Sequence, residues 1–268
     1  MTKPRILLRR AAAGFGFVLA LFMVSPGVAS AGTSNHGNVT CRGGSIAPGT
    51  YQSLRIAGIC SLDAGDVRVR GDVTILSKGG LNAGFGGSNI TVERDVVMRW
   101  KSLMVLGCEP GAFVCFNDPD QTTGTLSTND RVEGSLLATG ATLLVVHHSH
   151  LGAVIQSGGG GGVSCSVFPL GPSGPPAYTD YEDNTITGDA TVVSLRTCWS
   201  GFIRNRVGGS VTYSDNKLAD PDANEVVTNV IKHNLVCTTN SPKVQIGDSG
   251  GLPNKVGGKA LGQCAALV

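Results

Sequence analysis

The feature that most constrains the fold of this chain is a short motif that recurs along it at nearly regular intervals. Within each copy, apolar residues alternate with other residues, which is the period of a β-strand and not of a helix. In the C-terminal half each copy begins with asparagine, and the intervals between these asparagines are 21, 24 and 25 residues. The copies start at Val69, Val92, Val132, Leu151 (a degenerate copy), Asn184, Asn205, Asn229 and Asn254. Repeats of this length predict stacked structural units, as in solenoids and propellers.

The content of the repeat favours one architecture over the others. A leucine-rich repeat would carry a Leu-x-x-Leu-x-Leu skeleton, and a WD40 blade would need about 40 residues and a Trp-Asp pair. The sequence has neither pattern. A coil of two or three short strands with Gly and Asn at its bends fits a parallel β-helix, because both residues tolerate a left-handed backbone. Stacked coils would align Asn184, Asn205, Asn229 and Asn254 in a ladder whose side-chain amides bond neighbouring coils.

A family resemblance rests on the Asn-x-[Val/Ile]-x-Gly turns and on residues 199–205, 220–225 and 245–251. In these stretches the chain resembles the right-handed parallel β-helix proteins of the pectin-lyase-like superfamily, and especially small exported actinobacterial proteins of that fold. The resemblance covers residues 67–262 and implies an all-β, single-stranded, right-handed parallel β-helix. The superfamily includes lyases, hydrolases, esterases and non-catalytic surface proteins, so the resemblance implies no single activity.

Residues 1–31 predict export. Four basic residues precede an apolar run from Ala11 to Val24, and residues 29–31 offer small side chains for cleavage before Gly32. This order is typical of a secretory signal peptide, and the apolar run is shorter than the roughly 20 residues of a membrane-spanning helix. Removing the segment leaves 17 Lys and Arg against 19 Asp and Glu, a formal charge of −2. We expect a secreted or cell-surface protein with no membrane span after cleavage and no nucleic-acid partner.

Eight cysteines in an exported chain predict disulfide bonds, and the sequence has no CxxC spacing of the kind that zinc sites use. Eight cysteines allow on the order of a hundred different pairings. Because contacts in a repeat fold are local in sequence, we expect each cysteine to pair with its neighbour. The expected bridges are Cys41–Cys60, Cys108–Cys115, Cys165–Cys198 and Cys237–Cys264.

The remaining chain, residues 32–268, is predicted to form one domain. Residues 32–66 precede the clear copies of the repeat and are expected to cap the first coil. Residues 101–131 and 156–183 interrupt the period and are interpreted as insertions. Aromatic residues gather in or beside these insertions, and a platform that stacks sugar rings is predicted from Trp100, Tyr178, Tyr181 and Trp199. The alternative is that the insertions only cover an exposed corner of the solenoid.

Residues 220–225 hold the densest group of acidic oxygens. The candidate catalytic residues are Asp220, Asp222, Glu225 and the nearby Arg204. If the resemblance extended to a lyase, calcium would neutralise a uronate carboxylate and a basic side chain would abstract the C5 proton. The nearby candidates for this base are Arg204, Arg206 and Lys232. A glycosidase would use two carboxylates about 5–9.5 Å apart. The segment departs from a calcium loop, because Val226 and Ile231 replace the required Gly and Glu. The alternative is an Asp-Pro turn.

Two further motifs carry chemistry in other proteins. Residues 247–251, Gly-Asp-Ser-Gly-Gly, match the nucleophile segment of trypsin-like proteases, but the rest of that protease is missing and a turn is preferred. Residues 147–150, His-His-Ser-His, would place His148 and His150 on one face of a strand, where a carboxylate could complete a metal site. Spacing identifies no third ligand, so a corner or surface position is preferred and no metal is assigned.

These observations support two functions. The first is a non-catalytic protein of the cell envelope or extracellular space that binds a glycan or a partner along its side, or serves as a structural element. The alternative is a polysaccharide lyase or glycoside hydrolase that acts on an extracellular polysaccharide, with calcium as its possible cofactor. The sequence does not decide whether the protein is an enzyme.

Overall fold

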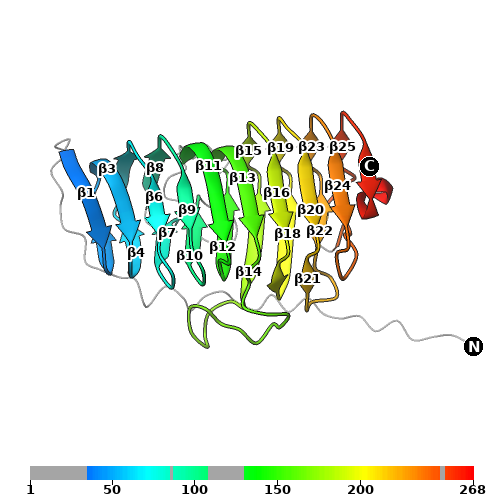
Figure 1. The fold of residues 1–268 in the computed structure, drawn as a ribbon, viewed down its shortest axis with the longest axis horizontal. Coiled ribbons are helices and arrows are strands. Elements are labelled where there is room, and N and C mark those ends of the chain that lie inside the picture. Colours follow the sequence, from blue (N-terminus) through cyan, green and yellow to red (C-terminus); the bar gives the residue numbers. More distant parts are fainter. Residues whose placement is uncertain (1–34, 85–86, 108–129, 248–250) are drawn as a thin grey trace, which may run out of the picture.

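The computed structural model describes residues 35–84, 87–107, 130–247 and 251–268. Within these ranges the chain is nearly all β-strand, and its one helix is the short 3-10 helix η2 (Gln263–Ala266). The strand pairings are parallel, and the strands stack along the long axis of the molecule (Figure 1). The predicted all-β fold with parallel sheets is therefore confirmed.

The strands form three sheets of 16, 8 and 2 strands. The N-terminal half of the largest sheet comprises β1 (Asn35–Cys41), β3 (Gly49–Ile56), β5 (Gly65–Val69), β6 (Val73–Ile75), β8 (Ser88–Val92), β9 (Val96–Met98), β11 (Arg131–Thr139) and β13 (His150–Ser157). Its C-terminal half comprises β15 (Thr185–Ile186), β16 (Ala190–Val193), β19 (Arg206–Val207), β20 (Val211–Ser214), β23 (Val230–Ile231), β24 (Leu235–Thr238), β25 (Lys255–Val256) and β26 (Ala260–Gly262). The eight-stranded sheet comprises β2 (Gly44–Ile46), β4 (Ile59–Leu62), β7 (Gly80–Ala83), β10 (Leu103–Leu106), β12 (Leu143–His147), β14 (Tyr178–Glu182), β18 (Trp199–Ile203) and β22 (Glu225–Val227). The smallest sheet pairs β17 (Arg196–Thr197) with β21 (Lys217–Leu218).

The register of the largest sheet aligns the copies of the sequence motif with one another. The first apolar residue of each copy has the corresponding residue of the next copy as its pairing partner. This column is Val69, Val92, Val132, Leu151, Ile186, Val207, Ile231 and Val256. Each copy of the repeat, here termed a coil, therefore lies beside the next copy in one parallel sheet.

The core lies between the two larger sheets, and alternate residues of each strand point into it. One such column crosses four strands of the eight-stranded sheet and consists of Val146, Tyr181, Phe202 and Val226. All four side chains are buried, and the rings of Tyr181 and Phe202 lie 6.0 Å apart in a tilted contact. Burial of side chains of this size stabilises a fold by about 1.5–3 kcal/mol each, so the inward columns hold successive coils together.

The predicted asparagine ladder is present at one corner of the coils. The backbone N–H groups of Asn184, Asn205 and Asn229 donate to the side-chain oxygen of the next ladder asparagine, at 3.0, 2.9 and 3.0 Å. Each side-chain amide also donates to a backbone carbonyl of the preceding coil, as from Asn205 to Tyr181 at 2.8 Å. These asparagines are buried, so the ladder satisfies backbone groups that water cannot reach.

A second ladder, which the sequence analysis did not predict, runs through another corner. Leu195 N–H donates to the side chain of Asn216, and Asn216 N–H donates to the side chain of Asn240, both at 3.0 Å. Gln263 continues the series, because its side-chain oxygen accepts a hydrogen bond from Asn240 N–H. The last coil is therefore closed by the same kind of contact at η2.

Three of the four expected disulfides lie in the described part of the chain, and all three are formed. They are Cys41–Cys60, Cys165–Cys198 and Cys237–Cys264. The expected Cys108–Cys115 bridge lies outside the described residues, as do the signal segment 1–31 and most of the first insertion.

The segments expected to differ from the repeat contribute strands to the same sheets. Residues 35–66 include β1 to β4, and β1 pairs with β3 while β2 pairs with β4. Two strands, β10 and β14, lie inside the ranges interpreted as insertions. The described remainder of the second range, residues 158–177, connects β13 to β14 and carries Cys165. Among the described residues, no helix has both the length and the apolar character that crossing a membrane requires.

Candidate functional site

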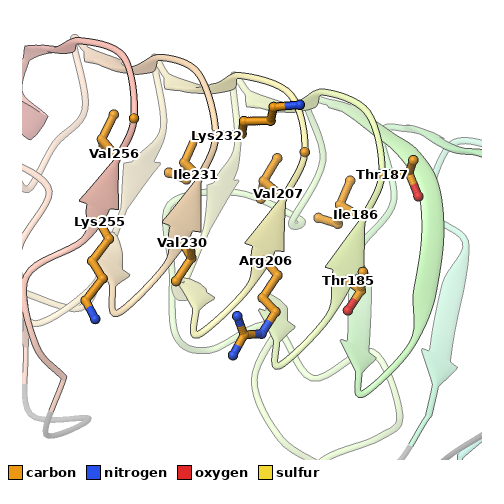
Figure 2. A pocket seen from close by; sticks show the side chains of 12 residues that line it. Thr185, Ile186, Thr187, Arg206, Val207, Val230, Ile231, Lys232, Lys255 and Val256 are labelled. Carbon is orange, nitrogen blue, oxygen red and sulfur yellow. The ribbon is translucent and has the colours of Figure 1, made fainter.

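A groove of about 740 Å³ crosses β15, β19, β23 and β25 on the outside of the largest sheet (Figure 2). The groove is formed by strands of two residues. In each strand one side chain points into the core and the other points outward. Its lining residues are Thr185, Ile186, Thr187, Arg206, Val207, Gly208, Val230, Ile231, Lys232, Lys255, Val256 and Gly257. The groove therefore runs along the stacking direction and presents one or two outward side chains per coil.

The charge of this groove is positive. Arg206 and Lys255 lie in one column of register partners with Val230 between them, and Lys232 lies two positions after Val230 in the sequence. None of the described lining residues is acidic, and within the described part of the chain these three cations form no ion pair. Val230 is 40% exposed, so an apolar surface separates the cations. The groove thus combines unpaired positive charge with an apolar floor.

A second candidate site lies on the outward face of the eight-stranded sheet. His147 on β12 is the register partner of Glu182 on β14, and Asp180 lies two residues before Glu182 on the same face. His147 Nε2 lies 3.1 Å from Asp180 Oδ2. One ligand atom from each of the three residues lies within 4.8 Å of the others. The strand pairing therefore brings a histidine and two carboxylates together from segments 33 residues apart.

The surroundings of this cluster raise the pKa of Glu182. Burial raises the pKa of Glu182 to about 7, and the negative charge of Asp180 adds to the increase, while His147 and Arg204 oppose it. Arg204 forms a two-pronged contact with Asp183, from Nε to Oδ1 and from Nη2 to Oδ2, each at 2.8 Å, and Nη2 also contacts Glu182 Oε2. These contacts raise the pKa of Arg204 above its ordinary value, with the hydrogen bond to Asp183 as the largest cause.

The four predicted catalytic residues occupy different surroundings. Asp220 accepts a hydrogen bond from Asp222 N–H at 3.0 Å, which is the Asp-Pro turn given as the alternative. Glu225 is buried at the start of β22 and pairs in register with Gly201. Arg204 follows β18 and is held by Glu182 and Asp183. The acidic partners of Arg204 are thus on β14 and just after it, rather than in residues 220–225.

The four predicted stacking aromatics also separate. Tyr181 is 0% exposed and donates its hydroxyl to Gln156 inside the core, which corrects its assignment to a surface platform. Tyr178 and Trp199 are half-buried neighbours whose rings lie 6.4 Å apart. Trp100 is 60% exposed and lies over Gly140, where an added Cβ would come within 2.3 Å of its ring. A sugar-stacking role therefore stays a prediction for Tyr178, Trp199 and Trp100.

The histidine-rich segment 147–150 forms a corner, as preferred from the sequence. His147 ends β12, His148 has a left-handed backbone with φ of 48°, and His150 begins β13. Of the Gly-Asp-Ser-Gly-Gly motif, residues 248–250 lie outside the described residues.

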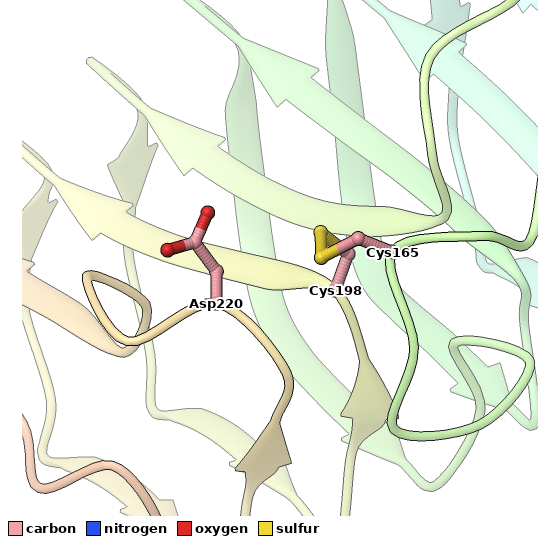
Figure 3. A group of neighbouring side chains, drawn as sticks. All are labelled: Cys165, Cys198 and Asp220. Atoms are coloured by element: carbon pink, nitrogen blue, oxygen red, sulfur yellow. A yellow bond between two sulfur atoms is a disulfide. The ribbon is translucent and has the colours of Figure 1, made fainter.

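A second group of metal-ligand residue types lies beside the turn at Asp220. Cys165, Cys198 and Asp220 lie close together (Figure 3). The two sulfur atoms are joined in a disulfide, so neither is a thiolate that could bind a metal. The disulfide beside Asp220 therefore gives no support to the calcium site considered for residues 220–225.

Sequence reasoning missed Asp180 and Glu182, because both lie in the range interpreted as an insertion. It also missed the cationic groove, whose three charges come from three different coils. An available signal was that Arg206, Lys232 and Lys255 each follow a ladder asparagine by one or three positions. Comparison with protein-family models, with curated proteins and with solved structures finds no match for this chain.

Proposed function

We propose that this chain is an exported, right-handed parallel β-helix that binds an acidic polysaccharide along its side without cleaving it. Two observations support the exported β-helix. Parallel strands recur once per coil, and connections between parallel strands of one sheet are right-handed in about 98% of cases. The three disulfides of the described residues fit an extracellular environment.

The groove over β15, β19, β23 and β25 carries the binding proposal. Neighbouring strands lie about 4.8 Å apart, so Arg206 and Lys255, two strands apart, are separated by about 10 Å along the stack. An extended polymer with a carboxylate on each sugar, lying along the groove, would meet cations at this spacing. The exposed side chain of Val230 would contact the apolar face of a sugar ring between them.

The chemistry of the lining supports binding without hydrolysis. A glycoside hydrolase needs two positioned carboxylates. The described lining consists of Thr, Ile, Val, Gly, Arg and Lys residues. The ammonium and guanidinium groups of such a groove attract carboxylates, and the attraction is screened by salt.

The test compares two triple variants that remove equal charge. Arg206→Ala/Lys232→Ala/Lys255→Ala removes the groove cations, and Arg42→Ala/Arg70→Ala/Arg99→Ala removes three exposed cations elsewhere. Calorimetric titration with polygalacturonate should show at least a roughly tenfold loss of affinity for the groove variant, which corresponds to about 1.4 kcal/mol. The control variant should stay within about twofold of the wild type.

Three results would contradict the proposal. They are equal losses in both variants, equal binding of a neutral glucan, and release of reducing ends or unsaturated uronates from polygalacturonate. The last result would favour the alternative function, a polysaccharide lyase or glycoside hydrolase.

A further inference from the structure

The outward face of β12 and β14 holds a histidine and two carboxylates that the groove does not use. The side chain of His147 is 1% exposed and that of Asp180 is 6% exposed. Glu182 completes the group, with a carboxylate oxygen within 4.8 Å of the other two donor atoms. The three donors therefore converge from two paired strands in a largely enclosed position.

We propose that His147, Asp180 and Glu182 bind a transition-metal ion, with zinc as the best match. Zinc in proteins is held by histidine nitrogen and carboxylate oxygen at about 2.0–2.2 Å, which in a tetrahedron puts neighbouring ligand atoms about 3.4 Å apart. His147 Nε2 and Asp180 Oδ2 already lie 3.1 Å apart. The Glu182 oxygen, which lies within 4.8 Å of the other two donor atoms, needs to approach them by at most about 1.4 Å to reach this spacing.

Strand pairing fixes this geometry before any metal arrives. His147 and Glu182 are direct register partners, and Val145 and Asp180 are the preceding pair on the same face. Side chains on one face of neighbouring strands have Cβ atoms about 5 Å apart, so the donors are positioned by the backbone and not by flexible loops.

The histidine selects the class of metal. Calcium and magnesium prefer sets of oxygen ligands alone, whereas imidazole with carboxylate suits zinc and its neighbours in the first transition series. Three protein ligands also leave one position of a tetrahedral zinc for water.

The net charge around the three donors is negative, which suits a divalent cation. Asp180, Glu182 and Asp183 carry up to three negative charges, and Arg204 supplies one positive charge to Glu182 and Asp183. Arg204 contacts the Oε2 atom of Glu182.

The test uses the full-length exported protein, stripped with a chelator and then dialysed against zinc sulfate. Elemental analysis should find about one zinc per chain. Cobalt should replace zinc and give the visible absorption bands of a histidine and carboxylate site. His147→Ala and the equal-sized Glu182→Gln should each weaken zinc binding at least about tenfold. His150→Ala, which changes an exposed histidine of the same corner, should leave zinc affinity unchanged.

The variants also separate ligation from folding. Circular dichroism should show that Glu182→Gln keeps the β spectrum of the wild type, and zinc should raise the melting temperature of the wild type but not of Glu182→Gln. A wild-type protein without stoichiometric zinc, or His147→Ala and Glu182→Gln variants that bind zinc as the wild type does, would overturn the proposal. The polysaccharide titration is independent of this outcome, because the groove shares no residue with the cluster.

Discussion

The two halves of the stack solve the same problem, the bending of the chain at each coil, in different ways. In the C-terminal half the strand breaks into a piece of two residues and a piece of four, as in β19 and β20, with Gly208 and Gly209 between them. The N-terminal half uses the same break between β5 and β6 and between β8 and β9, but it also contains unbroken strands. One of these is β11, which runs for nine residues with a register irregularity between Val132 and Ser135. Among the described residues, long unbroken strands at this bend are therefore confined to the N-terminal half.

At the bend between the strand pieces, which is exposed, both halves have side chains that accept hydrogen bonds from backbone N–H groups of the next coil. The two halves differ at the corner that holds the buried asparagine ladder. At the exposed bend Asp95 accepts from Ser135 N–H at 2.8 Å, and Asn234 accepts from Lys259 N–H at 2.9 Å. At the buried corner only the C-terminal coils stack asparagine on asparagine. In the coil before them the same position is Ser149, whose N–H donates to Asn184, and one coil earlier it is Asp130, which accepts from Ile90 N–H at 2.8 Å. An asparagine both accepts from a backbone N–H and donates to a backbone carbonyl, as Asn205 does, whereas an ionised carboxylate only accepts.

Breaking the buried ladder at its centre should have the largest effect on stability. Asn205→Ala removes the acceptor of Asn184 N–H and the donor to the Tyr181 carbonyl, and it leaves both backbone groups buried. Each such orphan costs about 1–3 kcal/mol, so the free energy of unfolding should fall by about 3–5 kcal/mol in urea titrations. Unfolding followed by circular dichroism measures this loss.

Asn234→Ala is the matched control from the exposed ladder. It removes one hydrogen bond to Lys259 N–H, but water can replace the acceptor because Asn234 is exposed. The loss should stay below about 1 kcal/mol. Equal losses for the two variants would mean that burial does not distinguish the two ladders.

Part of this contrast could be predicted from the sequence, and the rest could not. Asn184 and Asn205 stand before alternating apolar residues at a fixed interval, so their stacking follows from the repeat. Asn216 and Asn240 also stand 24 residues apart, but no alternating motif follows them and their ladder was missed.

The two candidate sites depend on the register of strand pairing even more than the asparagine ladders do. His147 and Asp180 are 33 residues apart, and only the pairing of β12 with β14 brings them to 3.1 Å. Sequence spacing within one segment, such as residues 220–225, finds acidic residues but not the partners that face them. The left-handed backbone was predicted at the asparagines, which is one position too late. Asp183 and Arg204 adopt it, and the ladder asparagine is the next residue in each case.

Replacing the buried Asp130 by asparagine should remove part of the pH dependence of the free energy of unfolding. Burial raises the pKa of Asp130 from 3.8 to about 7, and backbone hydrogen bonds from Ile90 and Gly107 oppose the increase. The folded state therefore binds a proton that the unfolded state releases, and the stabilisation is full below about pH 4 and is lost as the pH rises to about 7. Asp130→Asn should be more stable than the wild type by up to about 4 kcal/mol at pH 8 and equal to it near pH 4.

The measurement is the free energy of unfolding at several pH values for both proteins. Glu182 contributes a slope of the same sign, since its pKa is also raised to about 7, so the variant should keep a smaller slope and not a flat profile. Glu182→Gln provides the separate comparison. Identical pH profiles for the wild type and Asp130→Asn would show that the carboxyl group at this corner is not the source of the dependence.

The smallest expected effect comes from relieving the backbone at a C-terminal corner. Thr239 precedes the ladder residue Asn240 and has φ of 56°, a region that costs a β-branched residue about 1–2 kcal/mol. Thr239→Gly should stabilise the protein by about 0.5–1 kcal/mol, because glycine removes the strain but loses more entropy on folding. Thr228 has the same backbone, but its hydroxyl accepts a hydrogen bond from Leu252 N–H at 2.8 Å, so Thr228→Gly should gain less. Thr212→Gly, within β20, should lose about 1 kcal/mol. If all three variants lost stability equally, the corner backbone would not be strained and the contrast between corner and strand positions would fail.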